Sequence, residues 1–127
     1  MLMNAIEHGN CSITYEQKTE WLNENRSIHE LIKEKMADPI IQKRKIHFVY
    51  TLNPEYGSFK IADEGLGFNW RPFESCTCMD LGSVPNGRGI FIARKIADHL
   101  CYNSKGNEVS IGFRFDKPVS HFSVKSR

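Results

Sequence analysis

A single carboxylate followed by two glycines stands at the end of an apolar stretch. Asp63 comes directly after residues 59–62, and Gly65 and Gly67 follow it with the spacing D-x-G-x-G. A carboxylate accepts a hydrogen bond from an exocyclic amine such as that of adenine, and glycines leave room for a flat base beside the backbone. Asp and Gly also form ordinary turns, so this motif alone fits either a turn or a base-binding site.

Two further segments could serve the same chemistry. Residues 4–10, with the sequence NAIEHGN, open the chain with amide and imidazole side chains. Gly87 and Gly89 flank Arg88 just before the apolar-periodic stretch 90–98. Backbone N–H groups at a glycine-rich helix start bind anions such as phosphates. The chain therefore has an amide, then an aspartate with glycines, then glycines that open a helix.

These segments resemble the N box, G1 box and G2 box of the Bergerat-fold (GHKL) ATPases. Within that group, the sequence is most similar to the anti-sigma-factor serine/threonine kinases. The resemblance rests on NAIEHGN at 4–10, DEGLGF at 63–68, GRGI at 87–90 and YNSKGNEV at 102–109. It covers the chain from its first residue to the neighbourhood of residue 115.

The resemblance implies ATP or ADP and Mg²⁺ as ligands. It implies that the amide of Asn4 binds Mg²⁺, that Asp63 accepts the adenine amine, and that Gly65 and Gly67 shape the base pocket. An amide oxygen is a suitable ligand for a hard cation. Taken alone, Asn4 would be read as a surface asparagine of a helix.

The remaining candidate site residues have these possible roles, and two alternatives stay open for Arg88 and His8. Gly87 and Gly89 would let backbone amides approach the phosphates, and Arg88 either pairs with a phosphate or is solvated. His8 lies one helical turn after the N-box asparagine and is either close to phosphate or purely structural. Asn107 occupies a position where many members of the ATPase family that the sequence resembles carry a hydroxyl residue near the adenine aspartate.

The bulk properties narrow the class of protein. The 127 residues are enough for one domain, 1–127. A net charge of +2 implies neither a nucleic acid nor a membrane as partner. No apolar run is long enough to span a bilayer, and no signal peptide is recognisable, so we expect a cytoplasmic protein. The four cysteines lack zinc-site spacing, and we expect free thiols.

The predicted elements form an α+β two-layer sandwich, with a mixed, mainly antiparallel sheet and helices on one face. This is also what the resemblance to the Bergerat fold implies. We expect a short helix that ends at Gly9 and an inserted helical hairpin, 13–39, whose two helices start at Thr14 and Ser27. Packing is the better interpretation of that hairpin.

The rest of the chain is predicted as strands, a loop and one helix. The elements are a half-buried strand at 46–52, a strand at 58–62, a lid loop at 69–86, a helix at 87–100, a strand from 101, a strand at 109–115, and a tail or edge strand at 116–127.

The start of the chain departs from the family pattern. In the resembling kinases, a glutamate one turn before the N-box asparagine acts as general base, and here that position would fall before Met1. We therefore expect an N-terminally shortened domain that binds nucleotide weakly, shows no phosphotransfer and self-associates.

Three functions follow from these observations. The first is an ATP-binding anti-sigma-factor/serine-kinase-like domain of a bacterial signalling system, whose partner is an anti-anti-sigma-like or sigma-like protein. The second is a non-catalytic protein-interaction module that retains the fold. The third is a histidine kinase catalytic domain, although the inserted hairpin fits that class poorly.

Overall fold

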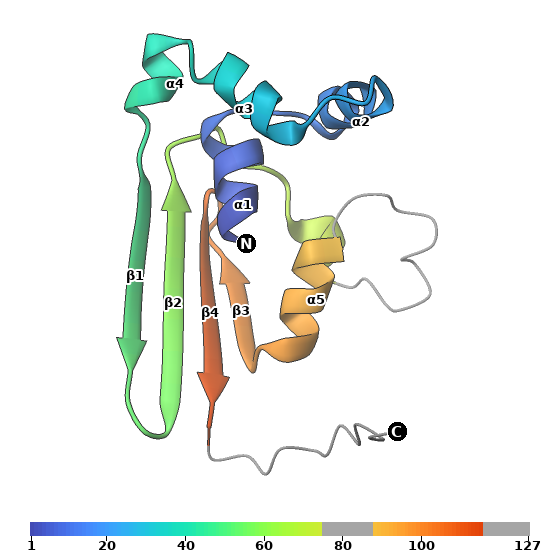
Figure 1. The fold of residues 1–127 in the computed structure, drawn as a ribbon. Helices are drawn as coiled ribbons and strands as arrows, with labels where there is room; N and C mark the ends of the chain where they lie inside the picture. Colours follow the sequence, from blue (N-terminus) through green and yellow to red (C-terminus); the bar gives the residue numbers. More distant parts are fainter. Residues whose placement is uncertain (75–87, 116–127) are drawn as a thin grey trace, which may run out of the picture.

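A computed structural model of the protein describes residues 1–74 and 88–115 (Figure 1). The elements are α1 (Leu2–Asn4), the π-helix η1 (Ala5–Asn10), α2 (Tyr15–Asn23), α3 (Ile28–Lys35), α4 (Pro39–Lys43), β1 (Ile46–Leu52), β2 (Tyr56–Asp63), the 3₁₀ helix η2 (Arg71–Phe73), α5 (Arg88–Ile96), β3 (His99–Tyr102) and β4 (Glu108–Arg114). Most of the predicted lid loop, and the predicted tail 116–127, lie outside these ranges.

The four strands of residues 1–74 and 88–115 form one sheet in the order β1-β2-β4-β3. Ile61 of β2 pairs with Phe48 of β1 and with Val109 of β4, and Val109 also pairs with Tyr102 of β3. Every described pairing is antiparallel, so the α+β class and the antiparallel character are confirmed. The expectation of a mixed sheet is wrong for the part of the chain that the structure describes.

The first helical segment and α5 cover one face of the sheet. The main core joins Ala5 of η1 and Ile90 of α5 to Ile61, Val109 and Ile111 of the strands. Because these strand residues alternate with outward-facing polar ones, one face of the sheet is apolar and packs against the helices. Figure 1 shows α1 and α5 over this face, with α2, α3 and α4 at one end of the sheet.

Local signals predicted the starts of the inserted helices well. Thr14 with Gln17, and Ser27 with Glu30, both form capping boxes, with side-chain and backbone bonds in each direction. Leu31 of α3 then packs with Cys11 and Ile13 in a second, smaller core. The sequence analysis missed α4, although Asp38 caps it and Pro39 occupies its first turn.

Two helix ends were predicted wrongly. Gly9 does not stop the first helix, because η1 continues to Asn10 through a π-type bond from the Cys11 N–H to the Ile6 carbonyl. The helix predicted at 87–100 ends at Ile96. The N–H of Asp98 bonds the Gly112 carbonyl at 2.9 Å, which draws the chain into the sheet.

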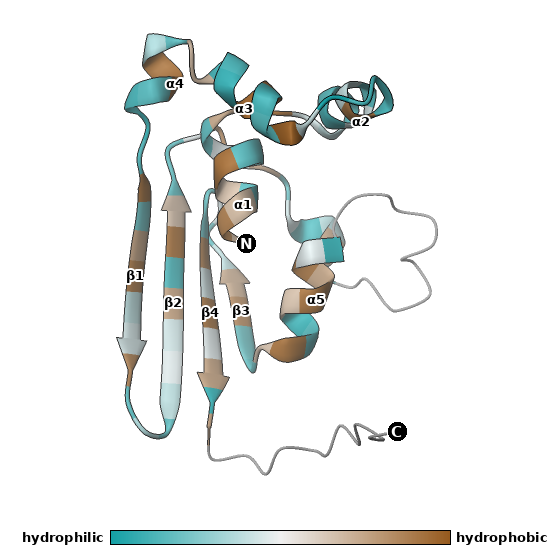
Figure 2. Cartoon of the chain, viewed as in Figure 1, coloured by the Kyte–Doolittle hydropathy of each residue, from teal (hydrophilic) through white to brown (hydrophobic). Residues whose placement is uncertain are grey.

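The prediction that β1 is half-buried is also wrong. Ile46 is partly buried, but Phe48, Tyr50 and Leu52 are 50%, 65% and 64% exposed. These side chains lie on the same face as the core, yet no described helix reaches them. Figure 2 shows hydrophobic stretches along β1, away from the helices.

Within the described ranges, no helix combines the length and apolar character needed to cross a membrane.

Candidate functional site

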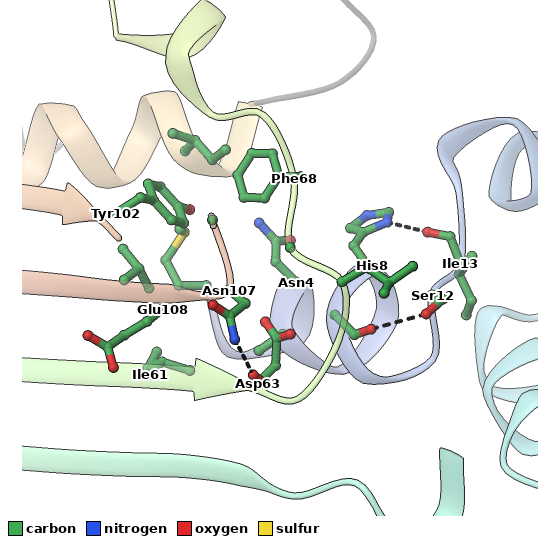
Figure 3. Close-up of a pocket in the computed structure, with 18 of the residues that line it drawn as sticks. Asn4, His8, Ser12, Ile13, Ile61, Asp63, Phe68, Tyr102, Asn107 and Glu108 are labelled. Carbon is green, nitrogen blue, oxygen red and sulfur yellow. Dashed lines mark hydrogen bonds between the residues drawn. The ribbon is translucent and has the colours of Figure 1, made fainter. Parts of the chain in front are cut away.

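A cavity of about 330 Å³ lies between η1, the β2 and β4 strands, the loop after β2 and α5 (Figure 3). Its size is at the lower end of the range of about 300–1,000 Å³ for small-molecule sites. Its apolar lining includes Ile61, Phe68, Ile90, Tyr102 and Val109. Its polar lining includes Asn4, His8, Asp63 and Asn107. Apolar walls with a few polar groups suit a flat heterocycle.

Asp63 lines this cavity, and its two carboxylate oxygens differ in their hydrogen bonding. Its Oδ1 accepts a hydrogen bond from the Gly65 N–H at 2.9 Å, while its Oδ2 accepts none from the described residues. Burial raises the pKa of Asp63, and the Gly65 N–H, Lys105 and Arg44 oppose that rise in part. The carboxylate is therefore partly desolvated, and its Oδ2 accepts no hydrogen bond from the described residues.

Two glycines let the backbone close around this carboxylate. A Cβ at Gly9 would overlap the Asp63 carboxylate, and a Cβ at Gly65 would overlap the Gly9 carbonyl oxygen. The packing explains why η1 carries a glycine where an ordinary helix would carry a side chain. Gly65 lies behind Asp63 and does not line the cavity.

Asn10 joins η1 to the turn that follows Asp63. Its side-chain Oδ1 accepts from the Glu64 N–H at 2.8 Å, and its backbone carbonyl accepts from the Arg44 guanidinium at 2.7 Å. The Glu64 carboxylate in turn accepts from the Lys45 N–H at 2.9 Å. This network fixes the position of the turn relative to the helix.

Asn107 lines the cavity, but its amide is already engaged at both ends. Its Nδ2 donates to the Asp63 carbonyl at 2.8 Å, and its Oδ1 accepts from Asn103 Nδ2 at 2.8 Å. The Asp63 N–H also donates to the Asn107 carbonyl at 2.9 Å. Asn107 therefore holds the backbone of Asp63, and this is the contact that the structure assigns to it.

His8 is fixed by the start of the inserted hairpin. Its Nδ1 lies 2.6 Å from the Ile13 carbonyl oxygen, so Nδ1 carries the hydrogen, because a carbonyl only accepts. Its ring centroid lies 4.4 Å from that of Tyr15. Figure 3 shows His8 beside Asn4 at the cavity and bonded to Ile13. The Nε2 edge is the part of the ring not used by this bond.

Asn4 and the start of α5 lie close together. A Cβ at Gly89 would stand 3.8 Å from Asn4 Nδ2, so no side chain separates the amide from the helix backbone. Arg88, the first residue of α5, is exposed and does not line the cavity. Gly87 lies outside the described residues.

The loop after Asp63 is clamped against the turn between β3 and β4. Gly67 has a φ of +76°, and a Cβ there would overlap the Lys105 carbonyl oxygen. Gly106, with a φ of +79°, has the same relation to the Phe68 carbonyl oxygen. Trp70 Nε1 donates to the Asn103 carbonyl at 2.8 Å. The backbone contact explains the need for glycine at both positions.

Aromatic rings close the cavity beside this clamp. Phe68 meets Tyr102 edge to face with centroids 5.2 Å apart, and Trp70 stacks on Tyr102 at 6.1 Å. Burial, foremost, raises the pKa of Tyr102 far above its ordinary value, so its hydroxyl stays protonated at neutral pH. The cavity thus combines a protonated phenol with a desolvated carboxylate.

Sequence analysis named five of the cavity-lining residues in advance: Asn4, His8, Asp63, Gly67 and Asn107. Ile90 and Tyr102 also line the cavity, although the motif segments 87–90 and 102–109 that contain them did not mark either as a site residue. Sequence analysis also assigned the inserted hairpin to packing alone, whereas residues 13–16 contribute to the cavity wall. The N-cap signal at Thr14 located the helix and gave no indication that its first turn would face a cavity.

The described polar groups of the cavity offer few ligands to a metal ion. Among the described residues, no group of three or more His, Cys, Asp or Glu side chains could hold a metal ion. Asn4 offers a single amide oxygen, which suits a cation that takes most of its ligands from phosphates and water. If magnesium binds with a nucleotide here, Asn4 is the residue that would contribute a ligand to it.

No protein-family model, no curated protein and no solved structure matches this chain.

Proposed function

We propose that this chain is an adenine-nucleotide-binding domain of the anti-sigma-factor serine kinase type, with a Bergerat fold and a role in bacterial signalling. The observation that carries the proposal is the convergence of Asn4 and Asp63 on one cavity. The two residues are 59 positions apart in sequence and were named from motifs alone. An amide for the metal and a carboxylate for the base face the same space.

The hydrogen bonding of Asp63 supports adenine as the base. Oδ1 already accepts from the Gly65 N–H, whereas Oδ2 accepts from no described residue and is the more available acceptor for a ligand. Adenine offers the single exocyclic amine that one oxygen can accept. Guanine would offer an adjacent N–H and amine, which together need two acceptor oxygens. The apolar side chains of Ile61 and Val109 suit the faces of the base.

The phosphates would lie toward Asn4 and the N-terminus of α5. Gly89 exposes backbone there, and Arg88 supplies a positive charge in the same turn. Magnesium bound with the nucleotide would supply charge neutralisation at the phosphates. Transfer to a serine of an anti-anti-sigma-like or sigma-like partner would then depend on positioning and charge stabilisation.

The test exchanges the acceptor for a donor at one atom. In Asp63→Asn, the side-chain oxygen still accepts the hydrogen bond from the Gly65 N–H, so the amide Nδ2 takes the place of Oδ2. By calorimetry, the variant should bind ADP about 5- to 150-fold more weakly than the wild type does. It should bind inosine diphosphate more tightly than the wild type does, because that nucleotide carries an oxygen in place of the amine. Glu20→Gln, on the exposed side of α2, makes the same chemical change away from the cavity and serves as control. An unchanged ratio of ADP to inosine diphosphate affinity in Asp63→Asn would contradict the proposal.

A second candidate is a protein-interaction module without nucleotide chemistry. The observation that favours it is the exposed apolar side of β1, with Phe48, Tyr50 and Leu52 each at least half exposed. A surface of this kind marks contact sites in many proteins. Absence of nucleotide binding by the wild type, together with self-association, would favour this candidate over the first.

A further inference from the structure

The turn between β3 and β4 is organised by one asparagine side chain. Asn103 Oδ1 accepts from the backbone N–H groups of Gly106 at 2.7 Å, Asn107 at 3.1 Å and Glu108 at 3.4 Å. Because these three groups only donate, the atom that they surround must be the amide oxygen. The other end of the amide, Nδ2, must therefore point away from the turn.

That nitrogen sets the orientation of a second amide. Asn103 Nδ2 donates to Asn107 Oδ1 at 2.8 Å, which places Asn107 Nδ2 on the opposite side. There it donates to the Asp63 carbonyl at 2.8 Å. The donors and acceptors run in one direction, from the turn to the strand end, and reversing either amide would put like groups face to face.

We propose that Asn103 is a positioning residue of the cavity, acting through Asn107 on Asp63. Asn103 does not line the cavity, so it acts without ligand contact. By holding Asn107, it fixes the peptide groups on both sides of the Asp63 Cα atom. The carboxylate is then held at the cavity with its Oδ1 on the Gly65 N–H. This proposal refines the proposed nucleotide site and rests on it for its ligand.

One substitution separates the effect of Asn103 on the turn from its effect on Asp63 through Asn107, which we call the relay. Asn103→Asp keeps an oxygen for the three turn N–H groups but replaces the Nδ2 donor by a second oxygen, which faces Asn107 Oδ1. Asn103→Ala removes both functions. If Asn103 acts through Asn107, Asn103→Asp should disturb the Asn107 amide and leave the turn intact.

The first measurement needs no ligand. Side-chain amide hydrogen exchange, followed by NMR, should be about tenfold slower for Asn107 than for the exposed Asn23 in the wild type. In Asn103→Asp, the Asn107 side-chain protection should be lost while the backbone N–H of Gly106 stays protected. Two results would overturn the proposal whether or not nucleotide binds. In one, the Asn107 side chain is not protected in the wild type; in the other, its protection is unchanged in Asn103→Asp.

The second measurement uses ADP as the probe. Asn103→Asp should weaken ADP binding about three- to tenfold in the wild-type background, as expected for the loss of one hydrogen bond. In the Asn107→Ala background the added charge remains, but no relay exists, so the substitution should have no further effect. Equal weakening in both backgrounds would overturn the relay. Failure of the wild type to bind ADP would refute the nucleotide site, and the exchange measurement would still decide the role of Asn103.

Discussion

The two sides of the sheet's apolar face have opposite environments. On the β4 and β3 side, Val109 and Tyr102 are 5% and 8% exposed beneath η1 and α5. On the β1 side, Phe48 and Tyr50 carry similar side chains and are 50% and 65% exposed. Alternation is the same in both regions. The difference teaches that the pattern of a strand shows which face is apolar, whereas burial depends on a second element that covers it.

The covered side also carries the candidate chemistry. Asp63 lies at the end of β2 where η1 packs against the sheet, and burial there raises its pKa. Glu64, the next residue, is exposed, and the Lys45 N–H and His47 lower its pKa. Two neighbouring carboxylates thus differ in pKa direction because one points into the cavity and the other to the surface.

The largest contrast should appear on truncating one aliphatic side chain in each region. Ile90→Ala removes a side chain that is 3% exposed, and should lower the free energy of unfolding by about 2–5 kcal/mol. Leu52→Ala, at a side chain that is 64% exposed, should cost less than about 1 kcal/mol. Urea denaturation of both variants measures this difference. Similar losses would mean that the β1 side is covered in solution.

A smaller contrast is expected for two glycines of β2 and the turn after it. Gly65→Ala places a methyl group against the Gly9 backbone, which cannot move without shifting η1, and should cost about 1–3 kcal/mol. In Gly57→Ala, the methyl group would meet the side-chain ends of Phe115 and Leu52, which are exposed and can rotate away. Its change in melting temperature should therefore be slight. A larger loss for Gly57→Ala than for Gly65→Ala would contradict the close packing of η1 on the turn.

The sequence predicted the parts of the fold that depend on neighbouring residues. Thr14 and Ser27 predict the starts of their helices, because each is an N-cap whose partner lies three positions further along the chain. The motif at Asp63 located the carboxylate in the same way. The bond from Asn107 to Asp63 joins residues 44 positions apart, and no local pattern indicates it. Likewise, α5 ends where the Asp98 N–H bonds the Gly112 carbonyl, 14 positions away, and the burial of β1 depends on elements distant in sequence.

A change of pH should sharpen the contrast between the two carboxylates. Because the folded-state pKa of Asp63 lies above its ordinary value of 3.8, the folded protein holds that proton more tightly than the unfolded chain. The stability due to Asp63 is therefore present below 3.8 and lost as pH rises through the folded-state pKa. Over this pH interval the wild type should lose stability relative to Asp63→Asn. The loss should be smaller than the losses expected for Ile90→Ala and Gly65→Ala.

Nucleotide binding should show the opposite trend over the same interval. An amine donor needs the ionised carboxylate, so ADP affinity should rise as pH increases through the Asp63 pKa and then level off. Calorimetry at several pH values measures it, with Glu20→Gln expected to follow the wild type. An affinity that falls as pH rises would rule out a donor from the ligand to Asp63.

The smallest expected effect on folding concerns the outer edge of β1. Among the described strands, this strand of seven residues lies at one end of the sheet, and Val49, on its outward face, is 59% exposed. An uncovered strand edge pairs with other chains, and a lysine placed on it opposes such pairing. We expect the wild type to self-associate and Val49→Lys to shift it toward the monomer in sedimentation analysis, with a change in unfolding free energy within about 0.5 kcal/mol. His99→Lys, on the four-residue edge strand β3, is the matched control and should leave association unchanged. Association that responds equally to both lysines would reflect net charge, and a wild type that stays monomeric at high micromolar concentration would show that the exposed side of β1 does not drive contact between copies.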